Sequence, residues 1–302
     1  TGKPVSPKHL LIYAGALLIG LLIPVLYGVA KELLNTSITN KEQLAMMLSA
    51  PVIGSIDQAD DHGEKFALVS KDDRSVAAEQ IRALRASLRF YAKKGKPLVV
   101  LSTSSFSGEG KTFLSSNLAR SYALQQQRVA LLEFDMRKPK LAKRMGYKTR
   151  HGISSVLTGA AAPGEVFVAD EETPLLHLYP TGAIPPNPSE LISTPEMENF
   201  MQYLQTNYDV IIIDSPPQGL VSDAQLLSQW SDVTLVVIRF NVTPRTQVRE
   251  IENWNRQNKL GKMAVVLNGV KTTGYYGYNY SPYYYRRKYG DDYYTTRSVK
   301  KG

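Results

Sequence analysis

Residues 98–112, LVVLSTSSFSGEGKT, decide the fold, because an apolar run leads directly into a glycine-rich loop. The Val and Leu run predicts a buried strand, and the residues that follow, through about Gln125, predict a helix. A strand, a glycine-rich loop, a Lys-Thr pair and a helix form the usual context of a phosphate-binding P-loop. The usual pattern has its first glycine where this chain has Ser105, and a chance glycine turn is the alternative.

The residue types in this loop suit a nucleotide. Gly108 and Gly110 let backbone N–H groups turn toward phosphate oxygens. Lys111 supplies a charge for the β- and γ-phosphates, and Thr112 supplies a hydroxyl for Mg²⁺. The loop therefore predicts a site for a nucleotide and its magnesium ion.

Two further strands are predicted to end in acids. Asp214 closes the apolar run 208–214, YDVIIID, at the end where ligands of open α/β sheets bind, so it is a candidate Mg²⁺ partner through water. The second run, VALLEFDMRKP at 129–139, places Glu133 and Asp135 on one side of a strand. A carboxylate there could accept a hydroxyl proton or bind a second metal ion. Alternatively, either acid caps the helix that follows Pro139.

The rest of the soluble part predicts an α/β fold with a mostly parallel sheet flanked by helices. Polar residues 57–64 predict a surface loop or linker. A short helix is predicted at 40–49 and another at 75–91, with Ser75 as its N-cap. The predicted strands are 51–56, 98–103, 129–134, 210–213, 233–238 and 263–267.

The ends of the chain differ from its middle in composition. Residues 10–30 carry no charge and as a helix would be about 31 Å long, which predicts a membrane span rather than a core helix or a signal peptide. Residues 271–302 carry a net charge of +5, out of +9 for the chain, and ten of its eighteen tyrosines. The expected organisation is a transmembrane helix with flanks at 1–31, a juxtamembrane linker at 32–64, a P-loop domain at 65–270 and a disordered tail at 271–302. There is no cysteine, which excludes disulfides, zinc-thiolate sites and a thiol nucleophile.

In combination these motifs resemble the bacterial tyrosine kinases coupled to polysaccharide export, which are P-loop enzymes related to the MinD/ParA ATPases. The resemblance covers roughly residues 40–302 and rests on SSFSGEGKT, LLEFDMRKP, IIIDSPP, GAIPPNPSELI at 182–192, and the terminal tyrosine cluster. The apolar helix resembles the last span of the chain-length regulator to which these kinases are fused. If so, the chain is a fragment and a first span and a periplasmic domain precede it.

The resemblance implies roles for individual residues. Lys111, Asp135 and Asp214 would be catalytic, and Glu133 would help to activate the tyrosine hydroxyl, although the family usually has Asp there. Thr112, Asp135 and Asp214 would hold Mg²⁺. Asn268 matches a position that often reads the adenine amino group. The residues implied to bind ATP are Ser107, Gly108, Glu109, Gly110, Lys111, Thr112, Phe113 and Asn268.

The resemblance also implies partners. Glu79, Arg82 and Arg85 match a motif that docks neighbouring subunits into a ring, for example an octamer; a solvated helix face is the other interpretation. The chain would lie in the bacterial inner membrane with its kinase domain in the cytoplasm, acting with polysaccharide polymerisation and export machinery and a cognate tyrosine phosphatase. Each tail would be phosphorylated by the next subunit; its acceptors would be Tyr275, Tyr276, Tyr278, Tyr280, Tyr283, Tyr284, Tyr285, Tyr289, Tyr293 and Tyr294.

Two other functions compete with this interpretation. A MinD/ParA-type ATPase switch would carry a second P-loop lysine that reaches the partner's nucleotide, and that position is Phe106 here. An inactive P-loop scaffold with a basic, aromatic tail could bind nucleic acid or another anionic surface. No groove or RNA-binding motif accompanies the tail, so no nucleic-acid partner is expected.

Overall fold

The structure, a computed structural model, describes residues 9–34, 36–58, 69–70, 73 and 75–271. The chain divides into two units, Thr1–Ser37 and Ile38–Gly302, which we describe separately. Most of the predicted loop at 57–64 lies outside the described residues, and so does the tyrosine-rich tail, with all ten acceptor tyrosines, from residue 272 onward.

The first unit contains one long helix, α1 (His9–Leu34). Its segment Leu11–Ala30 has a mean hydropathy of 2.2 and is exposed along its length. About 20 apolar residues suffice to cross the hydrocarbon core of a bilayer, so α1 is long and apolar enough to do so.

The second unit is built on a sheet whose strand order among the described residues is β1-β8-β7-β2-β6-β3-β5-β4. Neighbouring strands are parallel except β4 and β5, which confirms the predicted sheet type. The strands are β1 (Val52–Asp57), β2 (Leu98–Ser104), β3 (Val129–Glu133), β4 (Val168–Ala169), β5 (Leu176–Tyr179), β6 (Val210–Asp214), β7 (Val233–Arg239) and β8 (Met263–Val270).

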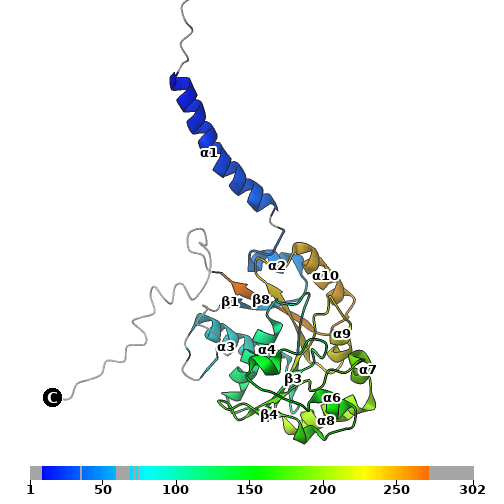
Figure 1. Cartoon of the computed structure of the whole chain (residues 1–302). Coiled ribbons are helices and arrows are strands. Elements are labelled where there is room, and N and C mark those ends of the chain that lie inside the picture. Colours follow the sequence, from blue (N-terminus) through cyan, green and yellow to red (C-terminus); the bar gives the residue numbers. More distant parts are fainter. Residues whose placement is uncertain (1–8, 35, 59–68, 71–72, 74, 272–302) are drawn as a thin grey trace, which may run out of the picture. The chain divides into compact units, whose positions relative to one another are not determined.

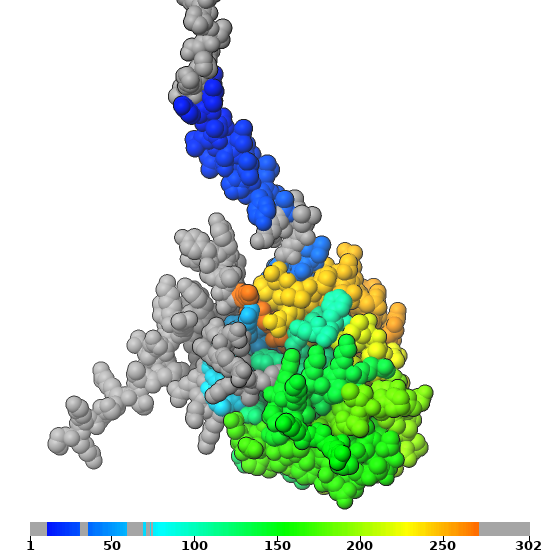
Figure 2. Space-filling view, in the orientation of Figure 1, coloured from blue at the N-terminus to red at the C-terminus, as the bar shows by residue number. Residues whose placement is uncertain are grey.

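Helices cover both faces of this sheet (Figure 1). On one face lie α3 and α4; on the other, α6 and α8 pack near β3 and β6, and α2 and α10 pack together near β7 and β8 (Figure 1). Figure 2 shows the blue α2 segment beside the yellow-orange α10 segment on the surface. The helices are α2 (Lys41–Met47), α3 (Val76–Leu88), α4 (Lys111–Ala123), α5 (Leu141–Arg144), α6 (Ile153–Leu157), α7 (Pro188–Ile192), α8 (Pro195–Asn207), α9 (Asp223–Ser228) and α10 (Arg245–Arg256), with 3₁₀ turns η1 (Arg89–Tyr91) and η2 (Pro163–Glu165).

The central strands are buried on both faces because their apolar side chains alternate. In β2, Val100 packs with the α3 and α4 side chains, and Val99 and Leu101 pack with those of α8. Burying a side chain of this kind contributes about 1.5–3 kcal/mol. Continuous Val, Ile and Leu runs therefore produce the parallel, two-sided sheet.

The segment before the P-loop is part of the folded unit. The helix predicted at 40–49 and the strand predicted at 51–56 are confirmed as α2 and β1, and β1 pairs in parallel with β8 and extends the sheet. Leu44 of α2 is fully buried in the cluster that also holds α10 residues. This burial and the backbone pairing explain why the segment belongs to the folded unit.

The predicted N-cap of α3 is confirmed. The Ser75 hydroxyl accepts a hydrogen bond from the Ala78 N–H at 3.3 Å. Two strands were not predicted: β5 has four residues with the polar His177 inside it, and β4 has two. Such short segments have too little apolar pattern to be recognised.

Candidate nucleotide site

The P-loop connects the carboxyl end of β2 to the N-terminus of α4. Gly108 and Gly110 have φ angles of 95° and 100°, a left-handed conformation that glycine adopts without strain. Gly110 is the N-cap residue of α4. Consecutive N–H groups at a helix N-terminus form a ready site for phosphate, so the backbone fits the predicted ligand.

Glu109 braces this loop from the inside. It is 1% exposed, and its carboxylate accepts hydrogen bonds from the Ser105 hydroxyl at 3.0 Å and the Phe106 N–H at 2.8 Å. The Thr243 hydroxyl also bonds to this carboxylate. Burial raises the pKa of Glu109, and these bonds oppose the rise. The Glu109 side chain thus shapes the loop, and Ser105, at the pattern's first glycine, is one of its partners.

Thr243 was not predicted as part of the site. It lies in the turn after β7, whose backbone pairs with the segment after α1: Ile38 N donates to the Thr243 carbonyl at 3.1 Å, and Asn241 N donates to the Ile38 carbonyl at 2.7 Å. No local pattern could identify Thr243, because its partner Glu109 is 134 residues away.

The structure brings Lys111 and Asp135 together. The Lys111 ammonium lies 3.1 Å from an Asp135 carboxylate oxygen, and the two side chains are 10% and 16% exposed. The other Asp135 oxygen accepts from the Lys138 N–H at 3.2 Å. The Asp135 carboxylate thus balances the charge of Lys111.

This ion pair makes the affinity for nucleotide depend on Asp135. Because phosphates must draw Lys111 away from Asp135, we expect Asp135→Asn to bind magnesium-free ADP about fivefold more tightly, roughly 1 kcal/mol. Titration calorimetry in EDTA measures the change. Unchanged or weaker binding would show that the pair does not compete with phosphate.

Asp214 lies behind this pair and is 1% exposed. The Ser115 hydroxyl lies 3.4 Å from one of its oxygens. Burial raises the pKa of Asp214, and the positive charge of Lys111 opposes the rise.

The donor set fits Mg²⁺, which is usually held by one or two carboxylates, waters and the phosphates of its nucleotide. Thr112 supplies a hydroxyl, and Asp135 and Asp214 supply carboxylates. In the described part of the chain, no group of three or more His, Cys, Asp or Glu side chains is arranged to hold a metal ion by itself.

Glu133 ends β3 next to Asp214, but its carboxylate turns inward. One oxygen accepts from the backbone N–H groups of Leu141 and Ala142 at 2.5 and 3.3 Å, and the other accepts from Thr181 N at 3.1 Å. Burial raises the pKa of Glu133, against the effect of these three bonds. The structure therefore matches the alternative that Glu133 caps the helix after Pro139.

Asn268 is 3% exposed, and its side-chain nitrogen donates to the Glu109 carbonyl at 2.9 Å. This bond holds Asn268 against the P-loop and uses its side-chain nitrogen, whereas an adenine amino group would donate to the side-chain oxygen. Beside it, at the end of β7, the Arg239 guanidinium lies against Gly269 and close to Gly110. The one signal for Arg239 in the sequence is a charged residue at the end of the apolar run 233–238.

Arg137, inside the second acidic motif, connects that motif to α7 and α9. Its guanidinium pairs with the buried Asp223 at 3.0 Å and donates to the Ser189 hydroxyl at 2.9 Å. Ser189 in turn donates to Asp223 at 2.6 Å. These contacts explain why the 182–192 stretch accompanies the site.

The arginines of α3 have partners within the chain. Arg82 pairs with Glu79 at 2.6 Å and donates to the Asp73 carbonyl at 2.7 Å. Arg85 donates to the Ser121 carbonyl at 2.5 Å and its hydroxyl at 2.8 Å, which ties α3 to α4. Burial lowers the pKa of Arg85.

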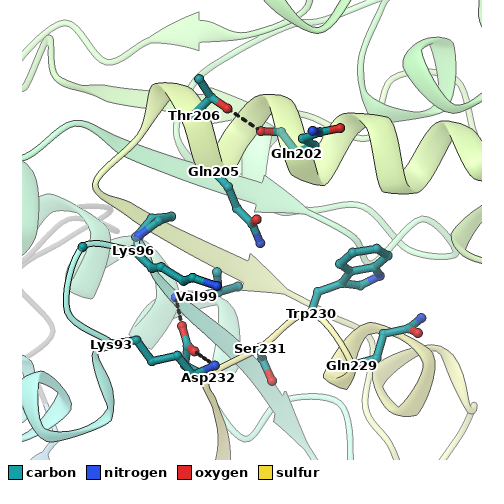
Figure 3. A pocket seen from close by; sticks show the side chains of 12 residues that line it. Lys93, Lys96, Val99, Gln202, Gln205, Thr206, Gln229, Trp230, Ser231 and Asp232 are labelled. Carbon is teal, nitrogen blue, oxygen red and sulfur yellow. Dashed lines mark hydrogen bonds and ion pairs between the residues drawn. The ribbon is translucent and has the colours of Figure 1, made fainter.

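A cavity of about 370 Å³ lies at the end of the sheet opposite the P-loop, where β2 begins (Figure 3). Lys93 and Asp232 pair across it at 2.7 Å, and Asp232 accepts from the Val99 N–H at 3.0 Å. No P-loop or acidic-motif residue lines it, so it is separate from the candidate nucleotide site.

No family model matches the chain. It is similar to the tyrosine-protein kinase YwqD of Bacillus subtilis, with 30% identity over 219 residues, 71% of this chain and 92% of the relative. It is also similar to the tyrosine-protein kinase Wzc of Salmonella typhi, with 29% identity over 299 residues, 93% of this chain and 41% of the relative. The chain thus spans about two fifths of the longer relatives.

The chain is also similar to solved structures of tyrosine kinase domains. The kinase domain of the Escherichia coli tyrosine kinase ETK superposes with a TM-score of 0.69 at 28% identity, covering 80% of this chain and 99% of that one. The BceF tyrosine kinase domain superposes with a TM-score of 0.68 at 25% identity, covering 78% and 100%.

Proposed function

The chain belongs to the bacterial tyrosine-protein kinases, and we propose that it is itself an ATP-dependent protein-tyrosine autokinase. The proposal is supported chiefly by one observation: Lys111, Asp135 and Asp214 lie together beyond the carboxyl ends of β2, β3 and β6, beside a loop whose Gly108 and Gly110 have positive φ angles. Mg²⁺ held by Thr112, Asp135 and Asp214 would supply electrostatic stabilisation of the transferred phosphoryl group.

The protein's own residues would do the positioning. Gly108 and Gly110 open the loop toward the phosphates, and Lys111 exchanges Asp135 for the β- and γ-phosphates. The Phe106 position supports a kinase over a MinD/ParA-type switch, which would have a lysine there.

The proposed substrate is the tyrosine-rich tail of a neighbouring copy. Ten tyrosines among 32 residues with a net charge of +5 form a dense set of acceptors. Each phosphate adds about −1.5 to −2 charges near pH 7, so three of them cancel that charge. We propose a ring of subunits, with Glu79, Arg82 and Arg85 at the contacts, that loses cohesion as the tails become anionic.

We further propose that α1 anchors the protein in the bacterial inner membrane, with the P-loop unit on the cytoplasmic side where ATP is available. The kinase would there regulate exopolysaccharide or capsule polymerisation and export, and a cognate phosphatase would reset it. The apolar segment Leu11–Ala30 supports the anchor.

The test incubates the full chain in detergent micelles with labelled ATP and Mg²⁺. We expect phosphotyrosine within 271–302 and none in a variant with its ten tail tyrosines changed to Phe. An Asp214→Asn chain should become labelled only when mixed with an active chain truncated after residue 270. Absence of phosphotyrosine would refute the kinase, and an unlabelled Asp214→Asn tail would refute transfer between subunits.

A further inference from the structure

The Glu133 carboxylate joins three segments of the chain. It ends β3, it accepts the first N–H groups of α5 from Leu141 and Ala142, and it accepts the N–H of Thr181 after β5. The Thr181 hydroxyl returns a hydrogen bond to the Glu133 carbonyl at 2.7 Å. Both loops that follow β3 and β5 are therefore fixed at one buried residue.

These contacts leave Glu133 badly placed to receive a proton from an acceptor tyrosine. A general base must come within about 2.6–3.2 Å of the hydroxyl whose proton it takes. Glu133 is 2% exposed, and both of its oxygens are already bonded to backbone N–H groups. Of the three acids at this edge, Asp135 is the most accessible, because its side chain is 16% exposed while Asp214 is 1% exposed.

The length of the side chain suits this bracing role. Glu133 lies opposite Asp214 in the sheet register, and its two oxygens reach amides on two separate loops. An aspartate is one methylene shorter and from the same backbone position could not span both. A carboxylate also makes stronger bonds to N–H groups than a neutral acceptor does.

We infer that Glu133 is a positioning residue of the proposed kinase, which holds the α5 and Thr181 loops around the site. This inference rests on the proposed function. It explains the longer side chain of Glu133 by the need to contact both loops, and not by a role in proton transfer.

Two substitutions of Glu133 distinguish a positioning residue from a general base, because the two roles predict opposite orders of activity for the variants. Glu133→Gln keeps the length and an acceptor oxygen for Leu141, whereas Glu133→Asp keeps the charge and loses the reach. For a positioning residue we expect Glu133→Gln to retain phosphorylation within about tenfold and Glu133→Asp to lose more. A general base predicts the reverse, because loss of the base costs about 10²–10⁴-fold. Greater activity in Glu133→Asp than in Glu133→Gln would overturn the inference.

Hydrogen exchange gives a readout that does not need kinase activity. The amides of Leu141 and Thr181 should exchange slowly in the wild-type chain and at least about tenfold faster in Glu133→Asp, with Leu141 still slow in Glu133→Gln. Unchanged exchange in Glu133→Asp would refute the brace. If this pattern holds but the wild-type chain forms no phosphotyrosine, the proposed function fails while the bracing contacts stand.

Discussion

Lys111→Met is expected to reduce tail phosphorylation by at least about 100-fold, the cost of losing one preorganised charge donor at a phosphoryl group. Methionine keeps the length of the side chain but cannot contact the β- and γ-phosphates. The Asp135 carboxylate, now unpaired 3.1 Å from the lost ammonium, would also repel them. Labelling with ATP and calorimetry with ADP measure the two effects.

Lys138→Met is the matched control. Its side chain is exposed, and it contacts Asp135 only through its backbone N–H at 3.2 Å. We expect activity within about twofold of wild type, as for other exposed substitutions away from special features. Equal losses in the two variants would mean that general positive charge, and not Lys111, supports the reaction.

Gly110→Ala is expected to weaken nucleotide binding about 30-fold or more. Its φ of 100° strains any residue with a Cβ, and that Cβ would overlap the side-chain nitrogen of Asn268. The strain and the displaced Asn268–Glu109 bond together cost about 2 kcal/mol, which corresponds to this loss in affinity. Calorimetry with ADP measures it, and circular dichroism checks that the unit stays folded.

Two further variants separate the effect of backbone strain from that of the overlap with Asn268. Gly95→Ala carries a similar strain, with a φ of 73°, in open space outside the P-loop, and should bind ADP normally. Adding Asn268→Ala to Gly110→Ala removes the overlap and should restore part of the affinity. If the double variant binds no better than Gly110→Ala, the overlap with Asn268 is not what limits binding.

The sequence was most informative where one short segment determines both structure and chemistry. The apolar runs of β2, β3 and β6 predicted the parallel sheet, and the residues at their carboxyl ends predicted that Lys111, Asp135 and Asp214 would meet. Parallel strands place their carboxyl ends at one edge, so this grouping follows from strand assignment alone.

Contacts between distant segments could not be predicted in this way. The direction in which Glu133 turns depends on the amides of Leu141 and Thr181, whose positions are set by α5 and by the unpredicted strand β5. The bond between Glu109 and Thr243 likewise depends on how β7 lies beside β2. Periodicity and motifs carry no information about such pairings.

The Lys111–Asp135 pair has a consequence for selectivity among anions. Any phosphate must displace this carboxylate to reach Lys111. An inorganic phosphate ion has one phosphate group to share between Lys111 and the N–H groups at the start of α4, whereas a di- or triphosphate can contact both with separate groups and so makes more contacts in return for the lost pair. The Lys111–Asp135 pair therefore favours nucleotides over the small phosphate ions that are abundant in a cell, because the Asp135 carboxylate competes with every anion for Lys111.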